Sequence, residues 1–202
     1  MADLSQQAVL PQLDRYVEWG GDARTAQVRR GLAWLGDVRG CRVLEIGARS
    51  GSMSVFLGLM GATVVGVDIH PEPLADARRL AASAGVGKRV TFEQRTGHPE
   101  DLPNGFDIAF VKSVLVIVPD LDAALAGIHG ALTGGGRIVA VENARGSLPV
   151  NVARMIRRRS LRPHGASYFD RASVDIFRRH FQLEVESWTQ MPPTVLLAGT
   201  RS

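Results

Sequence analysis

The chain has 202 residues, of which 45% are hydrophobic and 22% charged, and its formal net charge is +4. This length and composition fit one packed domain and exclude a wholly disordered chain. The single cysteine, Cys41, excludes an internal disulfide, which fits a reducing compartment. No apolar run approaches the roughly 20 residues that cross a bilayer, and residues 1–20 lack a secretory-signal pattern. We therefore expect a cytoplasmic protein.

Helices and strands are expected to alternate along most of the chain. Residues 4–36 read as two helices, with Asp22 as the N-cap of the second, so that residues 1–38 form an N-terminal helical cap. Leucine-rich or β-branched runs predict five strands, at 41–46, 63–68, 89–94, 106–111 and 137–142. Helices are predicted between them, at 52–60, 71–84 and 121–132, and the glycines at 134–136 are expected to close the last one.

The C-terminal part of the chain has a different pattern. A helix at about 172–180 leads to the runs 181–189 and 194–200, which a short proline turn joins into an antiparallel hairpin. The earlier alternation predicts a parallel sheet covered on both faces. We therefore predict a doubly wound α/β fold with a seven-stranded, mostly parallel sheet, and one domain over residues 1–202.

Residues 43–51 read Val-Leu-Glu-Ile-Gly-Ala-Arg-Ser-Gly, and Asp68 ends the next hydrophobic run seventeen residues after Gly51. Glycine lets a turn bring its backbone close to a ligand. An acid at the end of the second strand is where doubly wound folds bind ribose hydroxyls. The spacing therefore predicts a nucleotide site.

Over about residues 40–200 the chain resembles the class I S-adenosylmethionine-dependent methyltransferases. The resemblance rests on four blocks that occur in the family's order: 43–51; 65–72 (Val-Gly-Val-Asp-Ile-His-Pro-Glu); 97–103 with 106–110; and 131–142. The terminal hairpin also fits, because this fold ends with an antiparallel strand inserted beside the sixth. The fold that the resemblance implies is Rossmann-like.

The cofactor implied by the resemblance is S-adenosylmethionine. Glu45 would hold the ammonium of its methionine end, Gly47 would let the backbone pass close to it, and Asp68 would accept hydrogen bonds from the ribose hydroxyls. Ile69 would flank the adenine. The residues expected to bind the cofactor are Glu45, Gly47, Ala48, Arg49, Gly51, Asp68, Ile69, His98, Pro99 and Lys112.

Two segments depart from the family pattern. Arg49 stands where the family often has a glycine, so the loop must bend there without one. In the adenine loop, His98 and Pro99 replace an acid and a residue whose backbone N–H donates to the ring. Because proline has no N–H, adenine would be held by stacking, by His98 or by the nearby Glu100.

A nicotinamide or flavin oxidoreductase is the competing interpretation of the glycine turn. Its fingerprint requires three glycines spaced G-x-G-x-x-G, whereas here the glycine after Gly47 is Gly51. The carboxylate of Glu45 would also repel a pyrophosphate. This alternative therefore fits poorly.

No catalytic residue is assigned from the sequence. Methyl transfer is a direct displacement that positioning can accelerate, and it needs a general base only if the acceptor carries a proton. His70, His164 and Tyr168 are candidates for such a base, although each also fits a surface or packing role. Glu142 and Asn143 lack a convincing further ligand, so no metal site is predicted.

Between residues 151 and 180 there are eight arginines and two acids. Arg154, Arg157, Arg158 and Arg162 would lie on a basic amphipathic helix near the substrate mouth. Such a helix could bind an anionic acceptor or a membrane surface, and it equally fits a solvated surface helix.

The function predicted from these features is methyl transfer from S-adenosylmethionine to a small-molecule acceptor, at oxygen or nitrogen rather than carbon. An anionic or a lipid- or glycan-linked acceptor stays open. The alternative is a protein of the same fold that binds the cofactor or a nucleic acid without methylating a small molecule. Nucleic acid is disfavoured because no basic motif is interleaved with aromatic residues.

Overall fold

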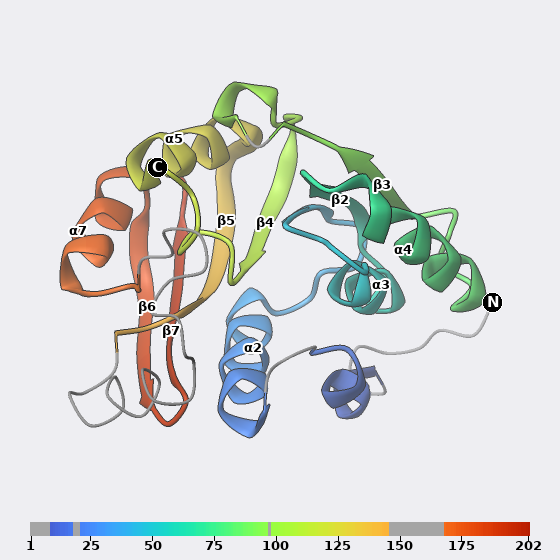
Figure 1. Ribbon diagram of the computed structural model, residues 1–202, viewed down its shortest axis with the longest axis horizontal. Helices are drawn as coiled ribbons and strands as arrows, with labels where there is room; N and C mark the ends of the chain where they lie inside the picture. Colours follow the sequence, from blue (N-terminus) through green and yellow to red (C-terminus); the bar gives the residue numbers. More distant parts are fainter. Residues whose placement is uncertain (1–8, 18–20, 97, 146–167) are drawn as a thin grey trace.

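A seven-stranded sheet forms the centre of the computed structural model, which describes residues 9–17, 21–96, 98–145 and 168–202 (Figure 1). The strands, in chain order, are β1 (Arg42–Ile46), β2 (Thr63–Asp68), β3 (Val90–Gln94), β4 (Phe106–Lys112), β5 (Leu132–Asn143), β6 (Gln182–Gln190) and β7 (Pro193–Thr200). The helices are η1 (Leu10–Arg15), α2 (Gly21–Leu35), α3 (Ser52–Leu59), α4 (Pro71–Ser83), η2 (Pro99–Asp101), α5 (Leu121–Ala131) and α7 (Arg171–His180).

The sheet has the order β3-β2-β1-β4-β5-β7-β6. Strands β1 to β5 are parallel to one another, whereas β7 is antiparallel to both β5 and β6. The predicted fold class is thereby confirmed, including the C-terminal hairpin. Because β1 connects to β2 on one side while β4 lies on its other side, the winding direction reverses between β1 and β4.

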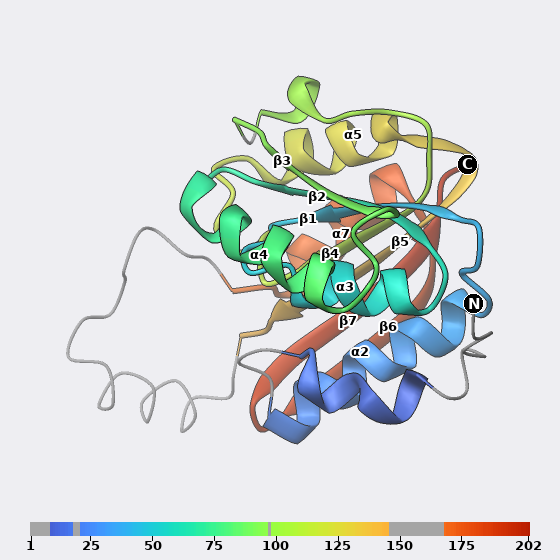
Figure 2. The same cartoon turned by 90° about the vertical axis from the view of Figure 1, so that its right-hand side faces the viewer.

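Helices cover both faces of the sheet (Figure 2). The apolar residues of α2, α3 and α4 pack on one face, together with η1, and those of α5 and α7 pack on the other. Successive residues of β1 show how the sequence requires this arrangement: Val43 joins the first cluster, Leu44 joins the second, and both are fully buried. A strand buried on both faces has adjacent apolar residues rather than alternating ones, as Val43 and Leu44 are.

Two expectations about element ends are wrong. Asp22 is not an N-cap, because α2 already begins at Gly21 and an N-cap residue has a non-helical backbone. The glycines 134–136 do not close a helix: α5 ends at Ala131, Leu132 is extended and pairs with Phe106, and the glycines lie inside β5. The ladder shifts register after that pair, between Phe106 and Ile108, so the glycines occupy an irregular part of the strand.

Across the described ranges, none of the helices combines the length and the apolar character that a membrane crossing requires.

Candidate functional site

A cleft runs along the carboxyl ends of β2, β1, β4 and β5, and its volume is about 1620 Å³. Asp68, Ile46, Lys112 and Asn143, which end these four strands, all line it. Open α/β sheets bind ligands at this edge, where the strand order reverses. A pocket for one drug-sized ligand measures about 300–1,000 Å³, so this cleft has room for a cofactor and a second small molecule.

The glycine turn after β1 is packed tightly against its neighbours. The N–H groups of Gly47 and Ala48 donate to the carbonyl of Val67, at 2.8 and 3.0 Å. Gly47 has a φ of +78°, and a Cβ at this position would lie 2.1 Å from Cγ2 of Val114. The turn therefore requires glycine at position 47 both for its backbone conformation and for the contact with the segment after β4.

Arg49 supplies the bend that the family often makes with a glycine. Its φ is +46°, in the left-handed region that side chains rarely adopt. In this conformation its N–H donates to Oδ2 of Asp68, at 2.9 Å. The strained backbone thus serves to hold the acid at the end of β2.

Asp68 is 8% exposed and is held from both sides. Besides the bond from Arg49 to Oδ2, Oδ1 accepts a hydrogen bond from the N–H of His70, at 2.9 Å. A carboxylate oxygen can accept two hydrogen bonds. Each oxygen of this fixed carboxylate can therefore accept one more bond from a ligand in the cleft.

Glu45 lies in the middle of the cleft edge, in β1, and is 3% exposed. The hydroxyl of the fully buried Ser54, in α3, donates to its Oε2. A cation beside a buried carboxylate interacts with it far more strongly than it would in water. Sequence reasoning missed Ser54, because a serine nine residues after Glu45 has no distinctive pattern.

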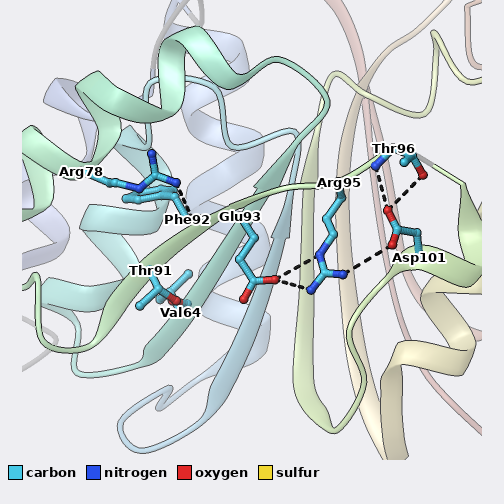
Figure 3. Close-up of polar contacts among 8 residues, drawn as sticks. All are labelled: Val64, Arg78, Thr91, Phe92, Glu93, Arg95, Thr96 and Asp101. Carbon is cyan, nitrogen blue, oxygen red and sulfur yellow. Dashed lines mark hydrogen bonds and ion pairs between the residues drawn. The ribbon is translucent and has the colours of Figure 1, made fainter.

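The loop after β3 is cross-linked by one arginine (Figure 3). The Arg95 guanidinium bonds to Oε2 of Glu93 and forms an ion pair with Asp101, at 3.4 Å. Asp101 accepts hydrogen bonds from the N–H and the hydroxyl of Thr96, at 2.8 and 3.0 Å, and these bonds hold the pKa of its carboxyl below the usual value. Arg95 and Thr96 line the cleft together with His98, so these contacts shape its wall.

At the other end of the cleft, Glu142 in β5 holds the segment that follows β4. It is 1% exposed, and its Oε1 accepts hydrogen bonds from the N–H groups of Val114 and Leu115, both at 3.0 Å. Its Oε2 has no hydrogen-bond partner in the part of the chain that the structure describes. Burial raises the pKa of Glu142 to about 7, although the bonds from Leu115 and Val114 and the charge of Arg24 act in the opposite direction.

A polar contact connects the first long helix to the end of β5. Nη2 of Arg24, in α2, donates to Oδ1 of Asn143 at 2.5 Å, and both residues line the cleft. They are 119 positions apart in the sequence. Sequence reasoning did not pair them, and only the packing of α2 against β5 and β7 brings them together.

Most of the residues predicted to bind the cofactor lie on this one cleft. Those that line it are Glu45, Gly47, Ala48, Arg49, Asp68, Ile69, His98 and Lys112. Gly51 caps the start of α3, with a φ of +77°, and Pro99 begins η2.

Of the candidate bases, His70 lines the cleft, whereas Tyr168 is 39% exposed and does not. His164 lies outside the described residues, as do the four arginines of the expected basic helix, Arg154, Arg157, Arg158 and Arg162. The described side chains include no group of three or more His, Cys, Asp or Glu that could hold a metal ion.

Comparison with known proteins shows similarity to methyltransferases in sequence and in fold. Residues 44–138 match a family model described as a methyltransferase domain. The solved structure of an S-adenosylmethionine-dependent methyltransferase from Mesorhizobium loti aligns with 90% of this chain and 99% of its own, with a TM-score of 0.70 and 20% identity. Residues 44–138 are thus similar to a methyltransferase domain family, and the fold is that of the Mesorhizobium loti methyltransferase.

Another similar protein has a more specific name. The magnesium protoporphyrin IX methyltransferase of Synechocystis PCC 6803, solved with bound S-adenosylhomocysteine, aligns with 99% of this chain and 97% of its own, with a TM-score of 0.69 and 20% identity.

Two proteins named ubiquinone biosynthesis O-methyltransferase are similar in sequence. The one from Pseudomonas syringae pv. tomato is 32% identical over 104 residues, which cover 50% of this chain and 44% of the relative. The one from Aeromonas salmonicida is 33% identical over 113 residues, covering 53% and 47%. The match thus spans less than half the length of these relatives.

Proposed function

We propose that this protein transfers a methyl group from S-adenosylmethionine to an oxygen atom of a small-molecule acceptor. The observation that carries the proposal is the pair of buried acids, Glu45 and Asp68, on one cleft at the point where the sheet winding reverses. The names of the sequence relatives, ubiquinone biosynthesis O-methyltransferases, favour oxygen as the acceptor atom.

The chemistry of the residues fits the cofactor at its three parts. Asp68 has two oriented oxygens, each with capacity for one further hydrogen bond, which suits the two ribose hydroxyls. The next residue, Ile69, is a large apolar side chain that is 50% exposed at the cleft, which suits the face of an adenine ring. Glu45, buried in β1, suits the ammonium of the methionine part.

This assignment also distinguishes the sulfonium cofactor from a dinucleotide. A pyrophosphate would have to approach the turn beside Glu45, whose carboxylate is buried and would repel it strongly. We therefore expect S-adenosylhomocysteine to bind and NAD not to compete with it.

The main contribution that the reaction requires from the protein is to position the acceptor in line with the methyl group. The bound cofactor supplies a methyl group on a positively charged sulfur, which a nucleophile displaces directly. Holding the two reactants in line can contribute several kcal/mol of the barrier, up to about 7–11 kcal/mol in the best cases. The segment after β4, which Glu142 fixes by two hydrogen bonds, forms the wall against which an acceptor would be placed.

The proposal is tested by incubating the protein with S-adenosylmethionine, labelled in the methyl group, and a panel of phenols and aliphatic alcohols. We expect label in the extracted acceptor and an equal amount of S-adenosylhomocysteine. Label on amine acceptors alone would move the reaction to nitrogen. Tight binding of S-adenosylhomocysteine with no turnover of any acceptor would favour the alternative of a protein that binds the cofactor without methylating a small molecule.

A further inference from the structure

The cleft has unlike charges at its two ends. Four carboxylates line the side formed by β1, β2 and α4, namely Glu45, Asp68, Glu72 and Asp76. The end formed by β4, β5 and α2 is lined instead by two cations, Lys112 and Arg24. Neighbouring strands are about 4.8 Å apart, so the end of β5 lies roughly 14 Å from Asp68 at the end of β2. The two ends are far enough apart to hold different molecules.

The remaining charges on the lining do not remove this contrast. Arg95 is on the acidic side, and its guanidinium is engaged by Glu93 and Asp101. Arg49 is also on that side, in the turn that follows β1. Asp120 is the remaining acid on the lining, and its Oδ1 accepts the N–H of Ala123 as the N-cap of α5. A carboxylate that already caps a helix compensates a nearby cation only in part.

Arg24 is held in place rather than extended into solvent. Its Nη2 donates to Oδ1 of Asn143 at 2.5 Å, which fixes the guanidinium at the end of β5. A guanidinium has five N–H donors in a planar fork that matches a carboxylate. The acid closest to it in β5, Glu142, is fully buried, and its pKa of about 7 leaves it only partly ionised near neutral pH. Arg24 lines the cleft at this end, with its guanidinium bonded to Asn143.

We propose that Arg24, positioned by Asn143, binds a carboxylate on the methyl acceptor, and that Lys112 adds positive charge at the same end of the cleft. The proposal rests on the proposed function, since it assigns the acidic side of the cleft to the cofactor and the basic end to the acceptor. It makes Arg24 a specificity-determining residue, and the acceptor class it selects is a hydroxylated carboxylic acid.

The test uses two probes that differ in charge and are otherwise similar in shape, 4-hydroxybenzoate and 4-hydroxybenzamide. Their dissociation constants are measured by calorimetry with the wild type, with and without saturating S-adenosylhomocysteine. Hydrogen bonds to charged groups contribute enough that we expect the carboxylate to bind about tenfold more tightly, or better.

Arg24→Gln is the informative variant, because an amide keeps a donor for Asn143 and removes the charge. We expect it to lose the preference for the carboxylate while its affinity for S-adenosylhomocysteine and its unfolding temperature stay close to those of the wild type. The matched control is Arg29→Gln on the same helix: Arg29 is solvent-exposed and does not line the cleft, so the preference should persist.

Three results would overturn the inference: equal affinity of the two probes for the wild type, no detectable binding of 4-hydroxybenzoate at millimolar concentration, or a preference that survives in Arg24→Gln. Failure of S-adenosylhomocysteine to bind would instead refute the proposed function, and the titrations without it would still decide the role of Arg24.

Discussion

Replacing Gly47 by alanine tests whether the turn after β1 needs glycine for both of the reasons found in the structure. A side chain in the left-handed region costs about 1–2 kcal/mol. The added Cβ would also lie 2.1 Å from Cγ2 of Val114, and forcing an extra methyl group into a packed site costs about 1–3 kcal/mol. The sum is about 2–5 kcal/mol, which for a chain of this size lowers the unfolding temperature by about 4–20 °C.

Gly36→Ala separates these two contributions. Gly36 has a similar φ of +68°, and a Cβ there would meet nothing within 4 Å, so this variant carries the backbone cost alone. We expect Gly47→Ala to be less stable than Gly36→Ala by about 1–3 kcal/mol in urea unfolding. Only Gly47→Ala should also weaken the binding of S-adenosylhomocysteine, because Val114 must move. Equal stability of the two variants would refute the steric part of the reasoning.

Three further predictions concern the polar contacts of the cleft. Ser54→Ala should destabilise the fold by about 1.5–3 kcal/mol in urea unfolding, because it removes a hydrogen bond to the buried carboxylate of Glu45; an unchanged midpoint would contradict that role. Arg95→Met should lower the free energy of unfolding by less than about 1 kcal/mol, because the ion pairs of Arg95 are partly exposed. It should nevertheless reduce the affinity for S-adenosylhomocysteine, measured by calorimetry, because the loop after β3 loses its cross-link. Glu142 has a pKa of about 7 in the folded protein, against an ordinary value of 4.5. Between these two pH values the folded protein retains a proton that the unfolded chain releases. The free energy of unfolding should therefore decrease by about 3 kcal/mol as the pH rises from 4.5 to 7. Glu142→Gln should remove this pH dependence and be the more stable protein at pH 8. If urea unfolding showed that wild type and variant lose the same free energy of unfolding between pH 5 and pH 8, the assignment would be wrong.

Local patterns in the sequence were sufficient to predict which residues of β1, β2 and the glycine turn lie together on the cleft. Glu45, Gly47 and Asp68 lie at the ends of strongly apolar runs, where strand ends and turns follow from short-range preferences. The departure at Arg49 was also visible, because a residue other than glycine at a bend stands out. The structure adds what such a residue does there, which is to orient its N–H toward Asp68.

The other end of the cleft could not be predicted, because its contacts join distant segments. The bond between Arg24 and Asn143 depends on how α2 packs across the sheet. The burial of Glu142 depends on the path of the segment after β4, whose N–H groups it accepts. The extent of β5 was missed for a related reason: pairing of Leu132 with Phe106 extends the strand through glycines that by local preference indicate a turn.

The central claim is that the two acids bind S-adenosylmethionine, and calorimetric titration of S-adenosylhomocysteine into the wild type and Asp68→Asn tests it most directly. The amide retains one acceptor oxygen and places an NH₂ group where a backbone N–H and a ribose hydroxyl both donate. We expect the wild type to bind and the variant to lose affinity by about 10-fold to 150-fold, the value of one charge-assisted hydrogen bond. Asp175→Asn on the solvent-exposed side of α7 should bind like the wild type. Absence of binding to the wild type, or equal affinity of Asp68→Asn, would contradict the account.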